Sequence, residues 1–138
     1  MFISETNIRV RYAETDQMNV VYHGNYAQYF EVGRAESIRQ LGYTYKDMEE
    51  MGIIMPIVEW HAKFIRPAHY DELLTIKTML KELPEGYRIE FHQEVYNEKE
   101  KLLTTGKVVL YFIEASTNEK TTMPKALKEK LMIYFLHG

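Results

Sequence analysis

The apolar residues change their period once along the chain, and that change restricts the folds open to it. Residues 25–41 contain no proline and place small or apolar side chains at helical spacing, namely Tyr26, Phe30, Gly33, Ser37, Ile38 and Leu41. Beyond Gly52 the pattern alternates with period 2, the spacing of a strand that has one buried face. The sequence therefore predicts one long helix followed by a sheet, with Gly33 allowing a close approach to whatever packs on the apolar face of the helix.

Four segments after the helix have the pattern of strands, at 58–64, 74–80, 87–95 and 102–113. In the first, Val58, Trp60 and Phe64 alternate with polar residues, as expected of a half-buried strand. The second and third are joined by turn residues at 84–86 and predict an antiparallel hairpin. The fourth ends in an apolar run, which predicts a central strand covered on both faces.

The order of these elements predicts an α+β fold. A strand at 3–11 precedes the helix, and a short helix is expected to begin near Pro124, so about five strands accompany one long helix. Consecutive strands joined by tight turns favour an antiparallel sheet wrapped around the helix, although other α+β sandwiches fit the same pattern. The 138 residues, 46% of them hydrophobic, predict a single domain, residues 1–138.

One charge falls on the apolar side of the predicted helix. Arg34 lies between Leu41 and Ala27 on a helical wheel, where a charge is costly unless a carboxylate meets it. Glu31, one turn earlier, is the nearest candidate partner. Alternatively, Arg34 extends to the edge of the apolar sector and Glu31 is ordinary solvated surface.

The residues before this helix carry acid and base groups. Tyr12, Asp16 and His23 place a phenol, a carboxylate and an imidazole on a short turn. An ionised carboxylate can attack an activated carbonyl carbon or take a proton from water, and an imidazole can exchange protons near neutral pH. Aspartate, asparagine and glycine are also common turn and capping residues, so Asp16 has a purely structural alternative.

The stretch from Tyr12 to Tyr26, in which Asp16 follows Tyr12 by four residues and His23 follows Asp16 by seven, resembles the signature of the hotdog-fold 4-hydroxybenzoyl-CoA thioesterase family. It is most similar to the Tol-Pal-associated acyl-CoA thioesterase branch. Supporting motifs are Tyr29-Phe30-Glu31 with Arg34, and 64–68 in a later strand. The resemblance implies the hotdog fold and hydrolysis of an acyl-CoA thioester to a carboxylic acid and free coenzyme A.

The resemblance also implies roles for individual residues. Asp16 would be the nucleophile or general base, and the backbone N–H groups of His23 and Gly24 would stabilise the oxyanion. His23 would orient Asp16, position water or protonate the departing thiolate, and Tyr12 would hydrogen-bond Asp16 or His23. Glu31 is the reserve carboxylate, because some hotdog thioesterases take their catalytic acid from the long helix.

The substrate-binding residues are less well marked. Relatives often carry basic residues at the hairpin turn for the phosphates of coenzyme A, whereas here only Arg88 and Lys81 lie near that turn. Lys63 and Arg66 are alternatives, and an acyl carrier protein substrate stays open. The acyl group would meet either an aliphatic tunnel or an aromatic pocket, lined by Tyr26, Tyr29, Phe30, Met55 and Trp60.

Several other classes of site are disfavoured. The chain has no cysteine, and its three serines lack the Gly-x-Ser-x-Gly elbow. His61 and His69 have no third ligand nearby in sequence, so neither metal nor cofactor is expected beyond coenzyme A in the substrate. A net charge of −3 with mixed signs gives no basic field for nucleic acid.

The remaining expectations concern location and assembly. No apolar stretch reaches ~18 residues and the first residues lack the pattern of a signal peptide, which predicts no membrane insertion and a cytoplasmic protein. The resemblance implies a homodimer or homotetramer with active sites at the protomer interface. The competing function is a noncatalytic module of the same fold that binds acyl-CoA or an acyl carrier protein.

Overall fold

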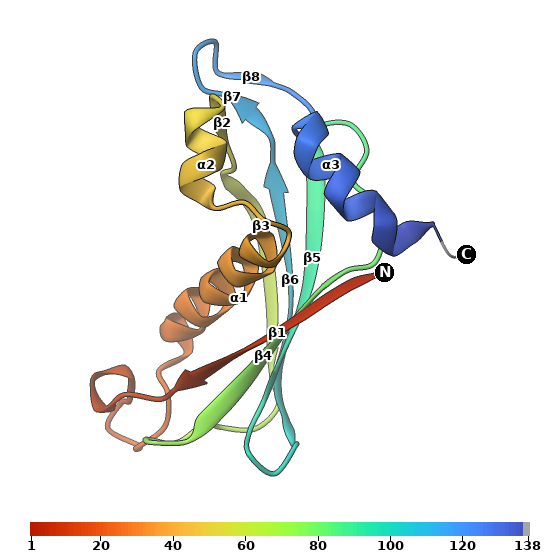
Figure 1. Ribbon diagram of the computed structural model, residues 1–138. Coiled ribbons are helices and arrows are strands. Elements are labelled where there is room, and N and C mark those ends of the chain that lie inside the picture. The colour runs from red at the N-terminus through yellow and green to blue at the C-terminus, as the bar shows by residue number, and fades with distance from the viewer. Residues whose placement is uncertain (137–138) are drawn as a thin grey trace.

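The computed structural model describes residues 1–136 and has a five-stranded antiparallel sheet at its centre, crossed on one face by a long helix (Figure 1). The helix is α1 (Tyr26–Gln40). In spatial order the strands are β1 (Phe2–Arg9), β4 (Leu73–Leu80), β5 (Arg88–Tyr96), β6 (Leu102–Tyr111) and β3 (Ile57–Phe64). This is the predicted arrangement of one helix and five strands.

A short helix and a small second sheet lie near the C-terminal end of α1 (Figure 1). Helix α2 (Tyr45–Glu50) is followed by a three-stranded sheet made of β2 (Ile53–Ile54), β7 (Ile113–Glu114) and β8 (Glu119–Lys120). Helix α3 (Lys125–Met132) follows Pro124, as predicted. Three short 3-10 turns occur at Tyr12–Glu14, His23–Asn25 and Ile133–Phe135.

The helix lies close to the sheet because Gly33 has no side chain. A Cβ atom at Gly33 would lie 2.7 Å from Ile76 Cγ2 and from Thr78 Oγ1, and 2.8 Å from Gln93 Nε2. No real Cβ tolerates such distances, so a larger residue would force the helix away. The predicted close approach at Gly33 is confirmed.

Most predicted boundaries agree with the structure to within two residues. The long helix was expected at 25–41 and spans 26–40, while the first strand was expected at 3–11 and spans 2–9. The hairpin turn is present, with Gly86 at a left-handed φ of +67°. Strand β6 lies between β5 and β3, one strand from the edge, and none of its residues is exposed.

The prediction for β3 was wrong in one respect. Its alternating pattern predicted one buried face, yet all eight of its residues are exposed, including Trp60 and Phe64. The reason is position: β3 is the edge strand away from α1, which packs mainly on β1, β4 and β5, so little of the chain covers the faces of β3. The apolar alternation therefore marks a surface that this single chain does not bury.

A group of buried side chains anchors the segment between β1 and α1. Tyr26 and Tyr29 of α1 belong to the same apolar cluster as Val10, Val21 and Ala68. Because these residues flank the turn that carries Asp16 and His23, the turn is attached to the core on both sides. This fixed attachment positions the candidate site.

Candidate active site

Asp16 lies in a tight turn that uses one of its two carboxylate oxygens. Its Oδ1 accepts a hydrogen bond from the main-chain N–H of Met18 at 2.8 Å, and its carbonyl oxygen accepts one from Asn19 at 3.0 Å. Asn19 adopts a left-handed φ of +64°, which asparagine tolerates well. Oδ1 therefore has the structural role considered for Asp16, whereas Oδ2 makes no hydrogen bond within residues 1–136.

Asp16 and His23 line one cleft. The cleft has a volume of about 310 Å³, and Tyr26, Phe64 and Arg66 also contribute to its wall. The side chain of Asp16 is partly exposed and that of His23 is exposed, its ring centroid lying 6.3 Å from that of Phe64. Asp16 and His23 do not hydrogen-bond each other within the described residues, so any coupling between them requires a bridging atom.

The helical turn beside this cleft begins with two backbone N–H groups that can act as donors. The 3-10 turn His23–Asn25 runs directly into α1. Among residues 1–136, the N–H groups of His23 and Gly24 have no hydrogen-bond acceptor. Free N–H groups at a helix start attract negative charge, and they are the donors predicted for the oxyanion.

Tyr12 is not where the predicted hydrogen bond requires it. Its side chain is 75% exposed, and its ring packs edge-on against Tyr70 with centroids 5.7 Å apart. In the part of the chain that the structure describes, its hydroxyl bonds neither Asp16 nor His23. Tyr12 lies in the 3-10 turn that follows β1 and not in the strand itself. It borders a separate hollow that Asp16 also lines.

Glu14 was missed by sequence reasoning and is the best-satisfied side chain of this region. Its Oε1 accepts hydrogen bonds from the Tyr29 hydroxyl at 2.9 Å and the Arg11 main-chain N–H at 2.8 Å. Its Oε2 accepts two from the Arg11 guanidinium, both at 3.1 Å. Its carbonyl oxygen accepts the N–H of Tyr22 and the side-chain amide of Asn25. Glu14 thus joins both ends of the loop to α1.

The protonation behaviour of Glu14 follows from these contacts. Burial alone would raise the pKa of this carboxyl group, but hydrogen bonds from Arg11 and Tyr29, with the positive charge of Arg11, lower it below the ordinary value. Burial and the neighbouring Glu14 carboxylate raise the pKa of the Tyr29 hydroxyl. The pair is therefore a carboxylate and a neutral phenol at neutral pH.

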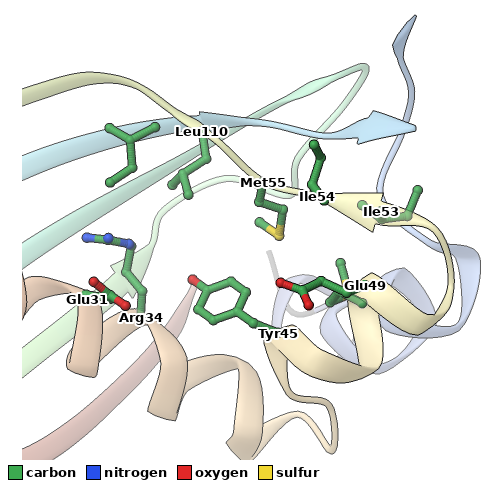
Figure 2. A pocket seen from close by; sticks show the side chains of 10 residues that line it. Glu31, Arg34, Tyr45, Glu49, Ile53, Ile54, Met55 and Leu110 are labelled. Atoms are coloured by element: carbon green, nitrogen blue, oxygen red, sulfur yellow. The ribbon is translucent and has the colours of Figure 1, made fainter. Parts of the chain in front are cut away.

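A second cavity lies at the opposite end of α1, and Figure 2 shows its polar side chains. It has a volume of about 280 Å³, and its polar lining consists of Glu31, Arg34, Tyr45 and Glu49. Arg34 is only 3% exposed, so the alternative in which it reaches the edge of the apolar sector is wrong. The guanidinium stays inside because its Nη1 donates to Gln93 Oε1 at 3.1 Å, with Glu31 nearby but exposed.

The candidate substrate-binding residues are spread over the sheet. Arg66 borders the Asp16 cleft and donates to the carbonyl of Leu102 at 3.0 Å. Trp60 lies midway along β3 against Phe30, while the exposed Lys63 borders a hollow on the other face of the sheet. Arg88 pairs with Glu59 and Glu90.

Strand register separates Arg88 from Asp16. Arg88 begins β5 at the end of the sheet where Phe2 pairs with Leu80, whereas Asp16 follows the other end of β1, where Arg9 pairs with Leu73. Within one chain these two residues therefore lie at opposite ends of the sheet. The structure brings Arg66 to the cleft and does not bring Arg88 there.

Metal ligands are not grouped in the described part of the chain. No three side chains of the types histidine, cysteine, aspartate and glutamate are placed to hold an ion in residues 1–136. Within the same residues, no helix has both the length and the apolar character needed to cross a bilayer.

Residues 10–131 match the family model described as the Thioesterase-like superfamily, so the chain belongs to that family and its fold is the hotdog fold. Over 97 residues, 70% of each chain, it is 40% identical to a protein named putative acyl-CoA thioesterase YneP of Bacillus subtilis. It is also 32% identical to an acyl-CoA thioesterase of Helicobacter pylori, covering 89% of this chain and 96% of that protein.

Solved structures agree with this assignment. A DHNA-CoA thioesterase from Staphylococcus aureus superimposes with a TM-score of 0.88 at 37% identity, covering 98% of this chain and 90% of that one. A 4-hydroxybenzoyl CoA thioesterase variant complexed with 4-hydroxybenzoyl CoA gives a TM-score of 0.81 at 19% identity, covering 94% and 99%, and supports the fold alone.

Proposed function

We propose that Asp16 is the catalytic carboxylate of an acyl-CoA thioesterase. As a member of the family, the protein is a thioester hydrolase that converts an acyl-CoA to a carboxylic acid and free coenzyme A. The observation that carries the assignment to Asp16 is its position. Within residues 1–136, Asp16 has one carboxylate oxygen without a hydrogen bond, in a cleft that it shares with His23, and the backbone N–H groups of His23 and Gly24 have no acceptor.

Two chemical routes fit this arrangement. In one, Asp16 Oδ2 attacks the carbonyl carbon, the coenzyme A thiolate leaves, and water then hydrolyses the resulting anhydride. In the other, Asp16 takes a proton from a water molecule whose oxygen attacks the same carbon. In both routes negative charge grows on the carbonyl oxygen, where the N–H groups of His23 and Gly24 would stabilise it. His23 would then protonate the leaving thiolate.

The site needs a second copy of the chain to be closed. Strand β3 has an open backbone edge and exposes Ile57, Val58, Trp60 and Phe64. Antiparallel pairing of two β3 edges would cover these residues and remove the edge, which favours a homodimer. Because a two-fold axis reverses the strand, the Phe64 end beside Asp16 in one copy would face the Ile57 end of the other.

The coenzyme A contacts and the location of the protein stay predictions. Arg66 is the favoured phosphate contact since it borders the Asp16 cleft, and Lys63, near the end of β3, is the alternative. Arg88 could contribute only from a different subunit, because within one chain it lies at the far end of the sheet. Cell fractionation would test the cytoplasmic location.

Thiol release from acyl-CoA substrates tests the proposal. Asp16→Asn should abolish thiol release while coenzyme A binding, followed by thermal shift, persists. Asp71→Asn is the matched control, since it makes the same chemical change at an exposed turn where φ is +67°. Binding by the native protein without any Asp16-dependent thiol release would instead favour the noncatalytic acyl-CoA or acyl-carrier module.

A further inference from the structure

Met18 is an exposed methionine in the wall of the Asp16 cleft. All eight methionines lie within residues 1–136, and Met18, at 75%, is the most exposed of them. It lines the cleft together with Asp16 and His23. The other exposed methionines have exposed fractions of 55% or less, and none of them lines this cleft: Met1, Met51 and Met132. A reagent in solution therefore meets Met18 at the candidate active site.

The turn that carries Met18 is held by hydrogen bonds, so the exposure of its side chain does not require local unfolding. The Met18 N–H donates to Asp16 Oδ1 at 2.8 Å, and the Asn19 N–H donates to the Asp16 carbonyl oxygen at 3.0 Å. The Asp16 N–H in turn donates to the carbonyl oxygen of Val20 at 2.9 Å. The thioether sulfur is thus accessible in the folded protein, and accessibility governs the oxidation of methionine.

The composition of the chain makes methionine its main target for a mild oxidant. The 138 residues include no cysteine, so hydrogen peroxide finds no thiol to attack. In the reaction with methionine, a sulfur lone pair attacks one peroxide oxygen, the O–O bond breaks and a sulfur–oxygen bond forms. The departing hydroxide takes the proton of the transferred hydroxyl and leaves as water. The sulfur is oxidised by two electrons, and the product is a sulfoxide.

A sulfoxide at this position changes the character of the cleft wall. The side chains that line the cleft with Met18 are mostly apolar and include Val20, Val21, Phe64, Ile65 and Pro67. A thioether fits such a wall because it is apolar and only a weak acceptor, whereas the oxygen of a sulfoxide is polar. Oxidation therefore replaces an apolar contact with a hydrogen-bond acceptor beside Asp16.

We propose that Met18 is an oxidation site through which hydrogen peroxide reversibly lowers the thioesterase activity. This inference rests on the proposed function, because its effect is exerted in the Asp16 cleft. The sulfoxide oxygen competes with the thioester carbonyl oxygen for the N–H groups of His23 and Gly24, which have no acceptor within residues 1–136. Methionine sulfoxide reductases reverse the step: two thiols become a disulfide, and the sulfoxide oxygen is released as water.

Peroxide treatment of the native protein in its own assembly state tests the proposal, with Met18→Leu and Met51→Leu as matched variants. Met51 is the control position because it is exposed at the end of α2, outside the cleft. After catalase has removed the peroxide, peptide mass spectrometry measures the oxidation of each methionine. Thiol release then gives the activity of each protein relative to the same protein before treatment.

The two variants should respond differently. The native protein and Met51→Leu should lose activity about fivefold or more as Met18 is converted, whereas Met18→Leu should keep most of its own activity. Methionine sulfoxide reductases A and B should restore the activity of the treated native protein. Full conversion of Met18 without loss of activity, or an equal loss in Met18→Leu, would overturn the proposal.

The oxidation step separates this inference from the assignment of Asp16, because it does not depend on turnover. Asp16→Asn should be oxidised at Met18 as fast as the native protein. If Asp16→Asn still hydrolyses thioesters, the catalytic assignment fails, and the comparison of the native protein with Met18→Leu still decides the role of Met18. A native protein in which Met51 is oxidised while Met18 stays reduced, because a second copy covers it, would also overturn the proposal.

Discussion

The two ends of α1 each hold a buried charge, but only one of the two charges is fully satisfied. At the N-terminal end, both carboxylate oxygens of Glu14 accept hydrogen bonds from Arg11 and Tyr29. At the C-terminal end, Arg34 is as deeply buried, yet within residues 1–136 its guanidinium donates to Gln93 and its Nε has no acceptor.

This difference in hydrogen bonding distinguishes a structural contact, at Glu14, from a position open to a ligand, at Arg34. A fully satisfied buried group rigidifies what it touches, and Glu14 touches the loop that carries Asp16 and His23. A buried donor without an acceptor destabilises the free protein, and a bound ligand that supplies an acceptor removes this penalty. We therefore expect the contacts of Glu14 to hold the loop of Asp16 in place, whereas the C-terminal end leaves a buried donor that a bound oxygen atom could satisfy.

The largest effect should come from the chemistry itself. Asp16→Asn is expected to lower kcat about a thousandfold or more, equivalent to about 4 kcal/mol of transition-state stabilisation. The unfolding temperature should change little, since the amide oxygen of asparagine can still accept the Met18 N–H. Steady-state kinetics and calorimetry measure both, and near-normal turnover would place the catalytic carboxylate elsewhere.

The next largest effect tests the scaffold. Glu14→Gln should destabilise the protein by about 2 kcal/mol, because its amide group presents donors where Arg11 and Tyr29 also donate. Glu36→Gln is the matched control: Glu36 also pairs with an arginine three residues away, Arg39, but in solvent, so a change below about 0.5 kcal/mol is expected. Urea unfolding compares them, and equal effects would remove the distinction drawn for Glu14.

The contribution of Glu14 should depend on pH. Because its pKa is lowered in the folded state, its stabilisation is complete above the ordinary carboxyl value of 4.5 and is lost as the pH falls through the folded value. The difference in unfolding free energy between native protein and Glu14→Gln should be constant from pH 6 to 7 and shrink below about pH 4.5. A difference that grows on acidification would contradict this assignment.

Replacing Arg34 should have a smaller effect on stability. Arg34→Met exchanges a partly satisfied buried charge for an apolar side chain of similar length, and such exchanges are often neutral. Gln93 loses one partner, so a change of no more than about 1 kcal/mol is expected. A loss as large as that of Glu14→Gln would mean that Arg34 is also scaffold, which urea unfolding would show.

The smallest effect should come from Glu31. Glu31→Gln keeps a hydrogen-bond acceptor in the cavity, so kcat/KM for an acyl-CoA substrate should fall only about two- to threefold. Side-by-side kinetics with Asp16→Asn are decisive, because a loss of a hundredfold or more would make Glu31 the catalytic carboxylate and reverse the roles given to the two ends.

Local patterns were enough to predict most elements and part of the site. The long helix, the hairpin and the close approach at Gly33 follow from spacing within a few turns of chain. Helix α2 was missed although its capping pair, Thr44 and Asp47, is visible as a short motif. Asp16 and His23 were singled out because the stretch from Tyr12 to Tyr26 resembles a family signature, and the structure places both at one cleft.

The roles of other residues depended on contacts between distant parts of the chain. A glutamate in the sequence Tyr-Ala-Glu-Thr gives no sign that Tyr29 will bond it from the next helix. The burial of Arg34 depended on Gln93, 59 residues away, and the exposure of β3 depended on its place at the sheet edge. Arg88 was a candidate substrate-binding residue, but strand register places it far from Asp16 of the same chain.

The alternation of helix and strand and the chemistry of the turn before α1 can be predicted from the sequence, because periodicity and turn propensities act over neighbouring residues. Which charges are satisfied depends on the folded chain, since Glu14 meets Tyr29 and Arg34 meets Gln93 only when the helix packs on the sheet.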